Sequence, residues 1–265
     1  MVEIIKKNIF IIIQKIDGII RGIADFNAYM KAIVRSFRSL RYLKIRSLYT
    51  IAVNQTRFTG IDALPLVSWI ALLLGATVII QATTNFPKYG IESFIGNLLV
   101  IIIARELGPL VTALIVVARS GSAIAAEIAT QTQNREILSL ELMGIDTRMY
   151  IILPRIVASF VAIFTLIIIF DIIAFFGGYL IALTSVYIPM GTFTQTLLDA
   201  FTFNDLLVTI TKSIIYGVLI PLICCYYGLK PKSSFEIPIF VSKAVIRTLL
   251  VIFIINAVIS ILFYF

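Results

Sequence analysis

Histidine is absent from this sequence of 265 residues, and cysteine occurs only twice. Without histidine, the chain has no imidazole ligand for a metal, no Ser-His-Asp or Cys-His pair and no histidine general base. Cys224 and Cys225 are adjacent in an apolar run, so on a helix they point to different faces and suit neither a disulfide framework nor a metal site. We interpret them as lipid-facing or core side chains, and we expect no catalytic residue, no metal and no cofactor.

A nucleotide-binding P-loop is also absent, since the pattern G-x-x-x-x-G-K-[ST] occurs nowhere in the chain. Charged residues are scarce: they make up 14% of the sequence, against roughly 25% in soluble domains. Hydrophobic residues account for 60%, and the mean hydropathy is +1.04. The sequence therefore predicts an integral membrane protein that is not an enzyme and has no ATPase site of its own.

Five stretches are apolar over the length that a membrane helix needs, about 20 residues for the hydrocarbon core. They predict an all-α integral membrane protein with spans at about residues 63–82, 94–118, 156–183, 206–229 and 244–265. We divide the chain into a basic cytoplasmic or interfacial tail, residues 1–62, and a transmembrane domain, residues 63–265.

Basic residues are concentrated before the first span. Residues 1–62 hold 11 of the 22 lysines and arginines, and the chain carries a net charge of +8. In so hydrophobic a protein, this excess indicates contact with anionic lipid headgroups rather than with nucleic acid. Lysine and arginine also favour the cytoplasmic side of a membrane, which places the tail inside and, after five spans, Phe265 at the outer face.

The tail carries a helical pattern from Lys31 to Arg46. At about 100° per residue, basic residues gather on one side and apolar residues on the other. The two groups are Lys31, Arg35, Arg38 and Arg46 against Ile33, Phe37 and Leu40. The pattern predicts an amphipathic helix that lies on the membrane surface. A solvated basic tail with chance periodicity is the alternative.

Apart from Arg247 near the start of the last span, the predicted spans contain four ionisable residues: Arg105, Glu106, Asp171 and Lys212. An ionisable side chain deep in a bilayer costs about 2.5 to 3.5 kcal/mol by insertion scales, so it normally faces a cavity or a partner. Neighbours in a helix point about 100° apart, so Arg105 and Glu106 cannot simply neutralise each other. Each of the four residues either contacts substrate or locks the bundle by pairing with another helix, and the sequence leaves both interpretations open.

A helix break follows directly, at Gly108 and Pro109. Proline removes one backbone hydrogen bond and clashes with the carbonyl four residues earlier, here that of Arg105. We therefore expect a hinge with an exposed carbonyl at the charged site. The pair Gly177-Gly178 instead predicts close packing between helices.

The most polar stretch between spans is residues 130–149. An apolar stripe of Ile137, Leu140 and Leu142 with Met143 within it predicts a short helix, and Gly144 is a typical helix stop. Flanking arginines place this helix in the cytoplasm.

Several separated motifs occur in the order typical of one family. They are ARELGPLVTALIVVARSGSAIAAEI, REILSLELMGID and LPRIVAS, followed by Gly177-Gly178, Lys212-Ser213 and Tyr216-Gly217. Over about residues 55–228, the chain closely resembles the MlaE/YrbE family of ABC transporter lipid permeases, which has TGD1-like members in plastids. The resemblance implies a permease subunit that moves phospholipid or a related lipid across or out of the membrane, powered by a separate ATPase subunit.

The resemblance also implies the partners of the chain. They are a P-loop ATPase subunit, an MCE-domain lipid-binding protein, a second copy of the permease and membrane lipids; no nucleic acid is expected. It further implies a multi-pass protein of the bacterial cytoplasmic (inner) membrane, and the plastid relatives leave room for an organelle membrane.

Family roles transfer only to matching residues. The resemblance places Arg105, Glu106 and Lys212 in a lipid-binding cavity. It assigns contact with the ATPase to residues after the second span: Glu127, Arg135, Glu136, Glu141, Met143, Gly144 and Asp146.

The chain departs from the family in two places. Ala129 and Gln131 stand where glycine and methionine are usual, and KPKSSFEIPIF replaces a glycine-rich loop before the last span. No role is therefore assigned to the loop 230–243, nor to Asp171.

A different class of protein is also compatible with the charged residues, namely an ion- or proton-coupled secondary transporter that uses Glu106, Asp171 and Lys212 as a relay. Such folds usually show paired repeats with a broken helix in each half, whereas this sequence has one Gly-Pro break in mid-span. A membrane scaffold without transport would need no buried charges. Neighbouring genes for a P-loop ATPase and an MCE-domain protein would favour the lipid permease.

Overall fold

The computed structural model describes residues 24–33, 35, 45–85, 95–183 and 189–264, which form helices joined by turns and contain no strand. Five helical segments within these residues are long and apolar enough to cross a membrane: Tyr49–Ala82, Asn97–Gln133, Thr147–Leu180, Phe203–Gly228 and Ser234–Tyr264. The prediction of an all-α membrane protein with about five spans is confirmed.

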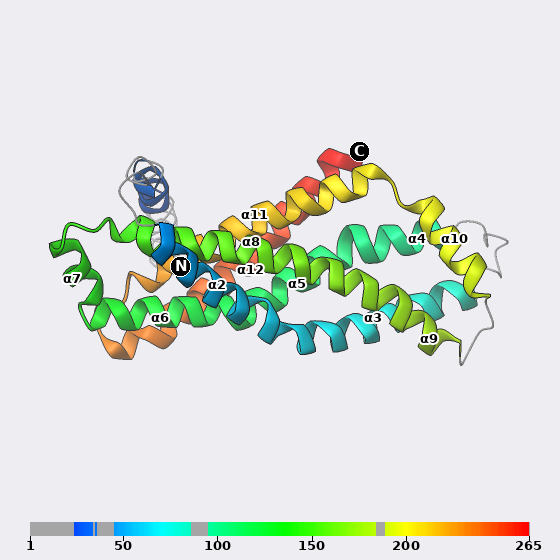
Figure 1. Ribbon diagram of the computed structural model, residues 1–265, viewed down its shortest axis with the longest axis horizontal. Helices are drawn as coiled ribbons and strands as arrows, with labels where there is room; N and C mark the ends of the chain where they lie inside the picture. The colour runs from blue at the N-terminus through cyan, green and yellow to red at the C-terminus, as the bar shows by residue number, and fades with distance from the viewer. Residues whose placement is uncertain (1–23, 34, 36–44, 86–94, 184–188, 265) are drawn as a thin grey trace, which may run out of the picture.

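Figure 1 shows these helices side by side in an elongated bundle, with α7 at one end and α4 and α10 at the other. The first span comprises α2 (Ile45–Thr59), the 3-10 turn η2 (Ile61–Ala63) and α3 (Leu64–Asn85). The second comprises α4 (Ile95–Leu99), the π-helical η5 (Val100–Leu107), α5 (Gly108–Val116), the π-helical η6 (Val117–Gly121) and α6 (Ser122–Gln133).

A short helix, α7 (Glu136–Leu142), leads to the third span, which comprises α8 (Thr147–Ile172), the π-helical η7 (Ile173–Gly177) and α9 (Gly178–Ala182). The helix α10 (Met190–Ala200) precedes the fourth span, α11 (Phe203–Gly228). The 3-10 turn η8 (Ser234–Glu236) precedes the last span, α12 (Ile237–Tyr264).

The helices are longer than the apolar stretches that predict them, and they extend mainly at one end. The second span is predicted over 94–118, but its helical segment runs over Asn97–Gln133, 37 residues. The first begins at Tyr49 rather than at residue 63. Both extensions lie on the side predicted to be cytoplasmic. The helices exceed the prediction because hydropathy marks where a helix leaves the hydrocarbon core, whereas its backbone hydrogen bonds continue beyond that point.

The central helix of the bundle is α11, which packs against α8, α12 and α6. Its buried face includes Tyr216, Lys212 and both cysteines, Cys224 and Cys225, each with no exposed surface. The cysteines are therefore core residues and do not face lipid. In contrast, α12 leaves large apolar side chains such as Phe253 exposed, as suits a helix in contact with lipid.

The described end of the basic tail belongs to the bundle, because α2 packs along α8. The predicted boundary between residues 62 and 63 falls within η2, the turn that joins α2 to α3. The predicted surface helix from Lys31 to Arg46 lies largely outside the described residues. In its described part, Lys31 is exposed and Ile33 is buried in the protein core, and the placement of this helix on the membrane stays a prediction.

Close packing joins α3 to η7 and α9. A Cβ on Gly178 would lie 2.5 Å from the carbonyl carbon of Gly75, and a Cβ on Gly75 would collide with the backbone of Ala174. The prediction from the pair Gly177-Gly178 is confirmed. The contact depends equally on Gly75, which no sequence pattern indicated.

We predict that Gly75→Ala destabilises the bundle by about 1 to 3 kcal/mol, as overpacking commonly does, because the backbone of Ala174 cannot move without shifting η7. Gly191→Ala is the matched control, since Gly191 lies in α10 with nothing within 4 Å of its Cβ position. Thermal unfolding in detergent should give a lower midpoint for Gly75→Ala alone. Equal midpoints for the two variants would contradict the packing argument.

Candidate functional site

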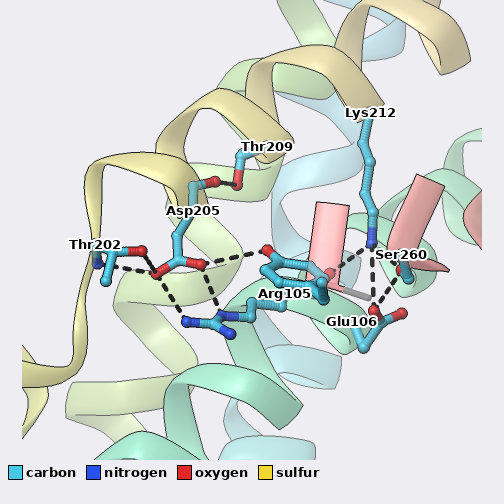
Figure 2. Close-up of polar contacts among 8 residues, drawn as sticks. Arg105, Glu106, Thr202, Asp205, Thr209, Lys212 and Ser260 are labelled. Atoms are coloured by element: carbon cyan, nitrogen blue, oxygen red, sulfur yellow. Dashed lines mark hydrogen bonds and ion pairs between the residues drawn. The ribbon is translucent and has the colours of Figure 1, made fainter. Parts of the chain in front are cut away.

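Arg105 and Glu106 lie in η5, the π-helical part of the second span. Although they are neighbours in sequence, their side chains reach different partners on other helices, as Figure 2 shows. Turns of π-helix are rare and frequently occur at functional sites. The two charges are therefore compensated separately, as the helical geometry predicts.

Arg105 pairs with Asp205 at the start of α11. Nε of Arg105 lies 2.7 Å from Oδ1 of Asp205, and Nη2 donates to Oδ2 at 3.3 Å. The guanidinium also lies over the ring of Tyr264, 4.7 Å from its centroid. Asp205 is held in turn by Thr202, whose backbone N–H and hydroxyl donate to Oδ2 at 2.9 and 2.8 Å. These two residues form the capping box of α11, so the start of a helix fixes the partner of Arg105.

Glu106 is held by residues of α11 and α12. Nζ of Lys212 lies 3.6 Å from Oε1 of Glu106 and donates to Oγ of Ser260 at 3.1 Å. Ser260 donates to Oε1 of Glu106 at 2.5 Å, and Nδ2 of Asn256 donates to Oε2 at 2.8 Å. Both carboxylate oxygens therefore have partners from neighbouring helices.

Lys212 makes a third contact, to the backbone carbonyl of Arg105 at 2.6 Å. In an α-helix, that carbonyl would accept a hydrogen bond from residue 109, but Pro109 has no N–H. We expected an exposed carbonyl at the Gly108-Pro109 break. That carbonyl instead accepts a hydrogen bond from the Lys212 ammonium. Two hydrogen-bond acceptors and the Glu106 carboxylate surround the ammonium, which explains how a lysine without exposed surface is tolerated.

Four further polar residues complete the site, and no sequence pattern had singled them out: Asp205, Asn256, Ser260 and Tyr264. Asp205 lies just before the predicted fourth span, where a Thr-x-x-Asp capping box could have identified it. Asn256 and Ser260 are four residues apart in an apolar span, which places them on one helix face. Tyr216 extends the network, since its hydroxyl donates to Oδ1 of Asn256 at 2.8 Å.

We call Arg105, Glu106, Asp205 and Lys212 the charged cluster. The side chains of Arg105 and Glu106 are 20% and 37% exposed, whereas those of Asp205 and Lys212 are 2% and 0% exposed. The cluster therefore presents one positive and one negative group side by side, each backed by a buried opposite charge. Lys212, expected to contact substrate, is closed to a ligand in this structure.

Asp171 does not join the charged cluster. It lies on α8, and a Cβ added at Gly108 would collide with its Oδ1. This oxygen is buried and has no hydrogen-bond donor in the described part of the chain. Across the same described residues, no group of three or more Cys, Asp or Glu side chains could hold a metal ion.

The residues expected to contact an ATPase lie near the opposite end of the bundle, around α7 (Figure 1). Glu127 lies apart from the other residues expected to contact an ATPase. The helix of the second span continues past residue 118, so Glu127 lies inside α6. There it pairs with Arg155 of α8 at 2.7 Å. This ion pair connects the second span to the third.

The helix α7 lies between two residues of positive φ: Arg135 at 58° and Gly144 at 75°. Gly144 confirms the predicted helix stop, because glycine adopts this conformation without steric cost. The predicted apolar stripe is divided, since Ile137 and Leu140 are half-buried whereas Leu142 is 81% exposed. The exposed apolar side chains of α7 and the residue after it are Leu138, Leu142 and Met143.

The acidic residues of this segment mainly stabilise it. Glu141 accepts a hydrogen bond from the hydroxyl of Thr147 at 3.0 Å, which ties α7 to the start of α8. Glu136 accepts one from the side chain of Asn134 at 3.1 Å. Asp146 occupies the N-cap position of α8, without a cap hydrogen bond from its side chain. Of the residues predicted to contact an ATPase, Met143 is the exposed apolar one.

Residues 52–262 match the protein family described as Permease MlaE, a range that contains the charged cluster and α7. A probable ABC transporter permease protein of Rickettsia felis is 30% identical over 216 residues, which cover 81% of this chain and 83% of that protein. The intermembrane phospholipid transport system permease protein MlaE of Haemophilus influenzae is 28% identical over 206 residues, covering 77% and 78%. The chloroplastic protein TRIGALACTOSYLDIACYLGLYCEROL 1 of Arabidopsis thaliana is 27% identical over 226 residues, covering 85% and 65%.

We predict that Lys212→Met lowers the stability of the protein by about 3 to 5 kcal/mol, because it removes the cation that pairs with Glu106 and the donor to the Arg105 carbonyl. Adding Glu106→Gln should recover part of this loss, since it removes the unpaired charge. Thermal unfolding in detergent of the parent, the two single variants and the double variant measures this coupling. Simple additivity of the two effects would show that the pair does not stabilise the fold as argued.

Proposed function

Because the chain belongs to the MlaE permease family, we propose that it is the permease subunit of an ABC transporter that moves phospholipid or a related lipid. A separate ATPase subunit supplies the energy, since this sequence has no P-loop. Five helices of membrane-spanning length and the phospholipid transport named for the Haemophilus relative support this role. Bacterial relatives support a multi-pass location in the cytoplasmic (inner) membrane, and the chloroplastic relative supports a plastid counterpart.

The observation that carries the proposal is the exposed side of the charged cluster. Arg105 and Glu106 present opposite charges side by side within a membrane span, where an ionisable residue normally faces a partner or a ligand. A phospholipid headgroup with a phosphate and an ammonium has matching charges. Arg105 binds the phosphate in this proposal, and Glu106 binds the ammonium.

The pairing of Arg105 leaves room for a phosphate. Asp205 engages Nε and Nη2 of the guanidinium, which has five donors in all. Nη1 can therefore donate to a phosphate oxygen while the ion pair stays intact. The planar donors of arginine suit phosphate oxygens, and Asp205 holds them in one orientation.

Lys212 acts through Glu106 and the hinge, rather than on the lipid itself. Its side chain has no exposed surface and contacts both Glu106 and the Arg105 carbonyl. A movement at Gly108-Pro109 would thus shift both lipid-binding side chains together. The lipid-binding side chains and the hinge are therefore coupled through Lys212.

The end of the bundle around α7 binds the ATPase in this proposal. Leu138, Leu142 and Met143 form an apolar surface on a short helix outside the predicted spans, and such patches commonly mark protein interfaces. Arg135 and Gly144 fix where this helix begins and ends. Force applied to α7 reaches the second span through its contacts with α6.

A second copy of this chain and an MCE-domain lipid-binding protein complete the proposed assembly, as the family resemblance implies. Exposed apolar side chains along α12, such as Ile246, Phe253 and Leu262, support a surface that lipid or another membrane helix covers.

The secondary-transporter alternative receives no support from the geometry. A relay would need Asp171 near Glu106 and Lys212. Asp171 instead packs against Gly108, and among the described residues no hydrogen bond or ion pair joins it to either partner of the relay.

We predict that Glu106→Gln slows ATP-dependent lipid movement by about tenfold, because a hydrogen bond to a charged group contributes roughly 1.5 to 3 kcal/mol. The control is Arg247→Gln, which removes an exposed charge on α12 away from the charged cluster. The measurement is transfer of a fluorescent phospholipid by the reconstituted complex, after checking that the ATPase is bound. An assembled Glu106→Gln complex working at the parental rate would contradict the headgroup assignment.

We also predict that the isolated chain hydrolyses no ATP and that Leu142→Asp weakens its association with the ATPase, since a carboxylate would replace an apolar contact. Gly191→Asp, which adds the same charge in α10 near the opposite end, should have no effect. Copurification and the ATPase activity of the complex are the measurements. Hydrolysis by the isolated chain would refute the permease role, whereas a fully associated Leu142→Asp complex would refute only the docking surface.

A further inference from the structure

A cavity of about 570 Å³ lies between α8, η7, α10 and α11, near the end of the bundle opposite α7. Its walls are mainly aliphatic and aromatic, with four phenylalanines and residues such as Ile168, Leu197 and Leu206. Its volume falls within the range of about 300 to 1,000 Å³ that small-molecule sites occupy. No described side chain fills this space.

The polar lining residues leave one group without a partner. Three threonine hydroxyls donate within the protein: Thr194 to the Met190 carbonyl at 2.9 Å, and Thr202 and Thr209 to the Asp205 side chain and carbonyl at 2.8 and 2.9 Å. Asp171 is the fourth polar lining residue, and its buried Oδ1 has no hydrogen-bond donor among the described residues. The cavity therefore offers hydrocarbon and a single carboxyl group.

A groove that only touched bilayer lipid would need no carboxyl. Burial of an ionisable side chain at membrane depth costs about 2.5 to 3.5 kcal/mol by insertion scales, so Asp171 requires compensation. Its Oδ1 lies against Gly108, a residue without a side chain that could donate a hydrogen bond. A ligand in the cavity that carries its own donor would compensate this carboxyl group.

The cavity also adjoins the charged cluster. Thr202 and Thr209 line the cavity and hydrogen-bond to Asp205, the partner of Arg105. Asp171 lines the cavity and packs against Gly108, two residues beyond Glu106. A lipid held here lies beside the Arg105–Asp205 pair of the charged cluster.

We propose that this cavity is a second lipid site, which takes one acyl chain of an amine-bearing phospholipid and places its ammonium against Asp171. The apolar walls match the chain, and the carboxyl matches an N–H donor. The lipid then lies beside the Arg105–Asp205 pair, to which Thr202 and Thr209 connect the cavity. This inference rests on the proposed lipid permease function.

The test uses the complete complex in a lipid bilayer and two probes with the same photoreactive acyl chain, phosphatidylethanolamine and phosphatidylcholine. Only the first has N–H donors on its headgroup. We expect its cross-links to map to α8, α10 and α11 and to exceed those of phosphatidylcholine by about tenfold, equivalent to roughly 1.4 kcal/mol. Asp171→Leu should abolish this preference.

Leu206→Trp should lower cross-linking of both probes, because it fills the cavity, while Leu207→Trp is the matched control. Both leucines are on α11 and half-exposed, but only Leu206 lines the cavity. If the cavity residues and the exposed residues of α12 were cross-linked equally, the probe would only be sampling bilayer lipid, and the proposed site would be refuted. ATP-dependent lipid movement is measured in the same samples: movement without cavity labelling refutes the second site alone, and absence of movement by the parent refutes the proposed function.

Discussion

Pairing of an accessible charge with a buried one across helices is the interaction on which this structure depends. Arg105 with Asp205 and Glu106 with Lys212 are compensated across helix boundaries, within an apolar bundle that offers few alternative partners. Losing one member leaves its partner buried without compensation, which costs more than the pair itself contributes. The two pairs therefore fix the register of η5 against α11, and Asn256 and Ser260 add α12 to the same arrangement.

The backbone takes part in this arrangement at Pro109. Since proline cannot donate to the Arg105 carbonyl, a side chain must do so, and Lys212 supplies the donor from the central helix α11. One buried ammonium thus compensates both a carboxylate and a break in the helix. This shared contact explains why the break and the two accessible charges, Arg105 and Glu106, cannot move independently.

The length of the second span relates the two ends of the molecule. Its helical segment of 37 residues would extend about 55 Å at 1.5 Å per residue, well beyond the roughly 30 Å of the hydrocarbon core. The charged cluster lies near one end of it, and α7 follows the other. The ion pair between Glu127 and Arg155 connects this segment to α8 on the way. A single helical element therefore joins the surface proposed for the ATPase to the site proposed for lipid.

By itself, the sequence determined the fold class, the number of spans and the family. It also determined that Arg105 and Glu106 lie within a span and that a helix stops at Gly144, because hydropathy, helix stops and motif order are local properties. It did not determine where the helices end outside the membrane, since backbone hydrogen bonds continue after apolarity stops. Only the tertiary structure decided the partners of the charges: Asp205 lies 100 residues from Arg105, and Ser260 lies 154 from Glu106. It also decided that Lys212 is closed to ligand, because burial depends on which helices surround a side chain and not on its own neighbours in sequence.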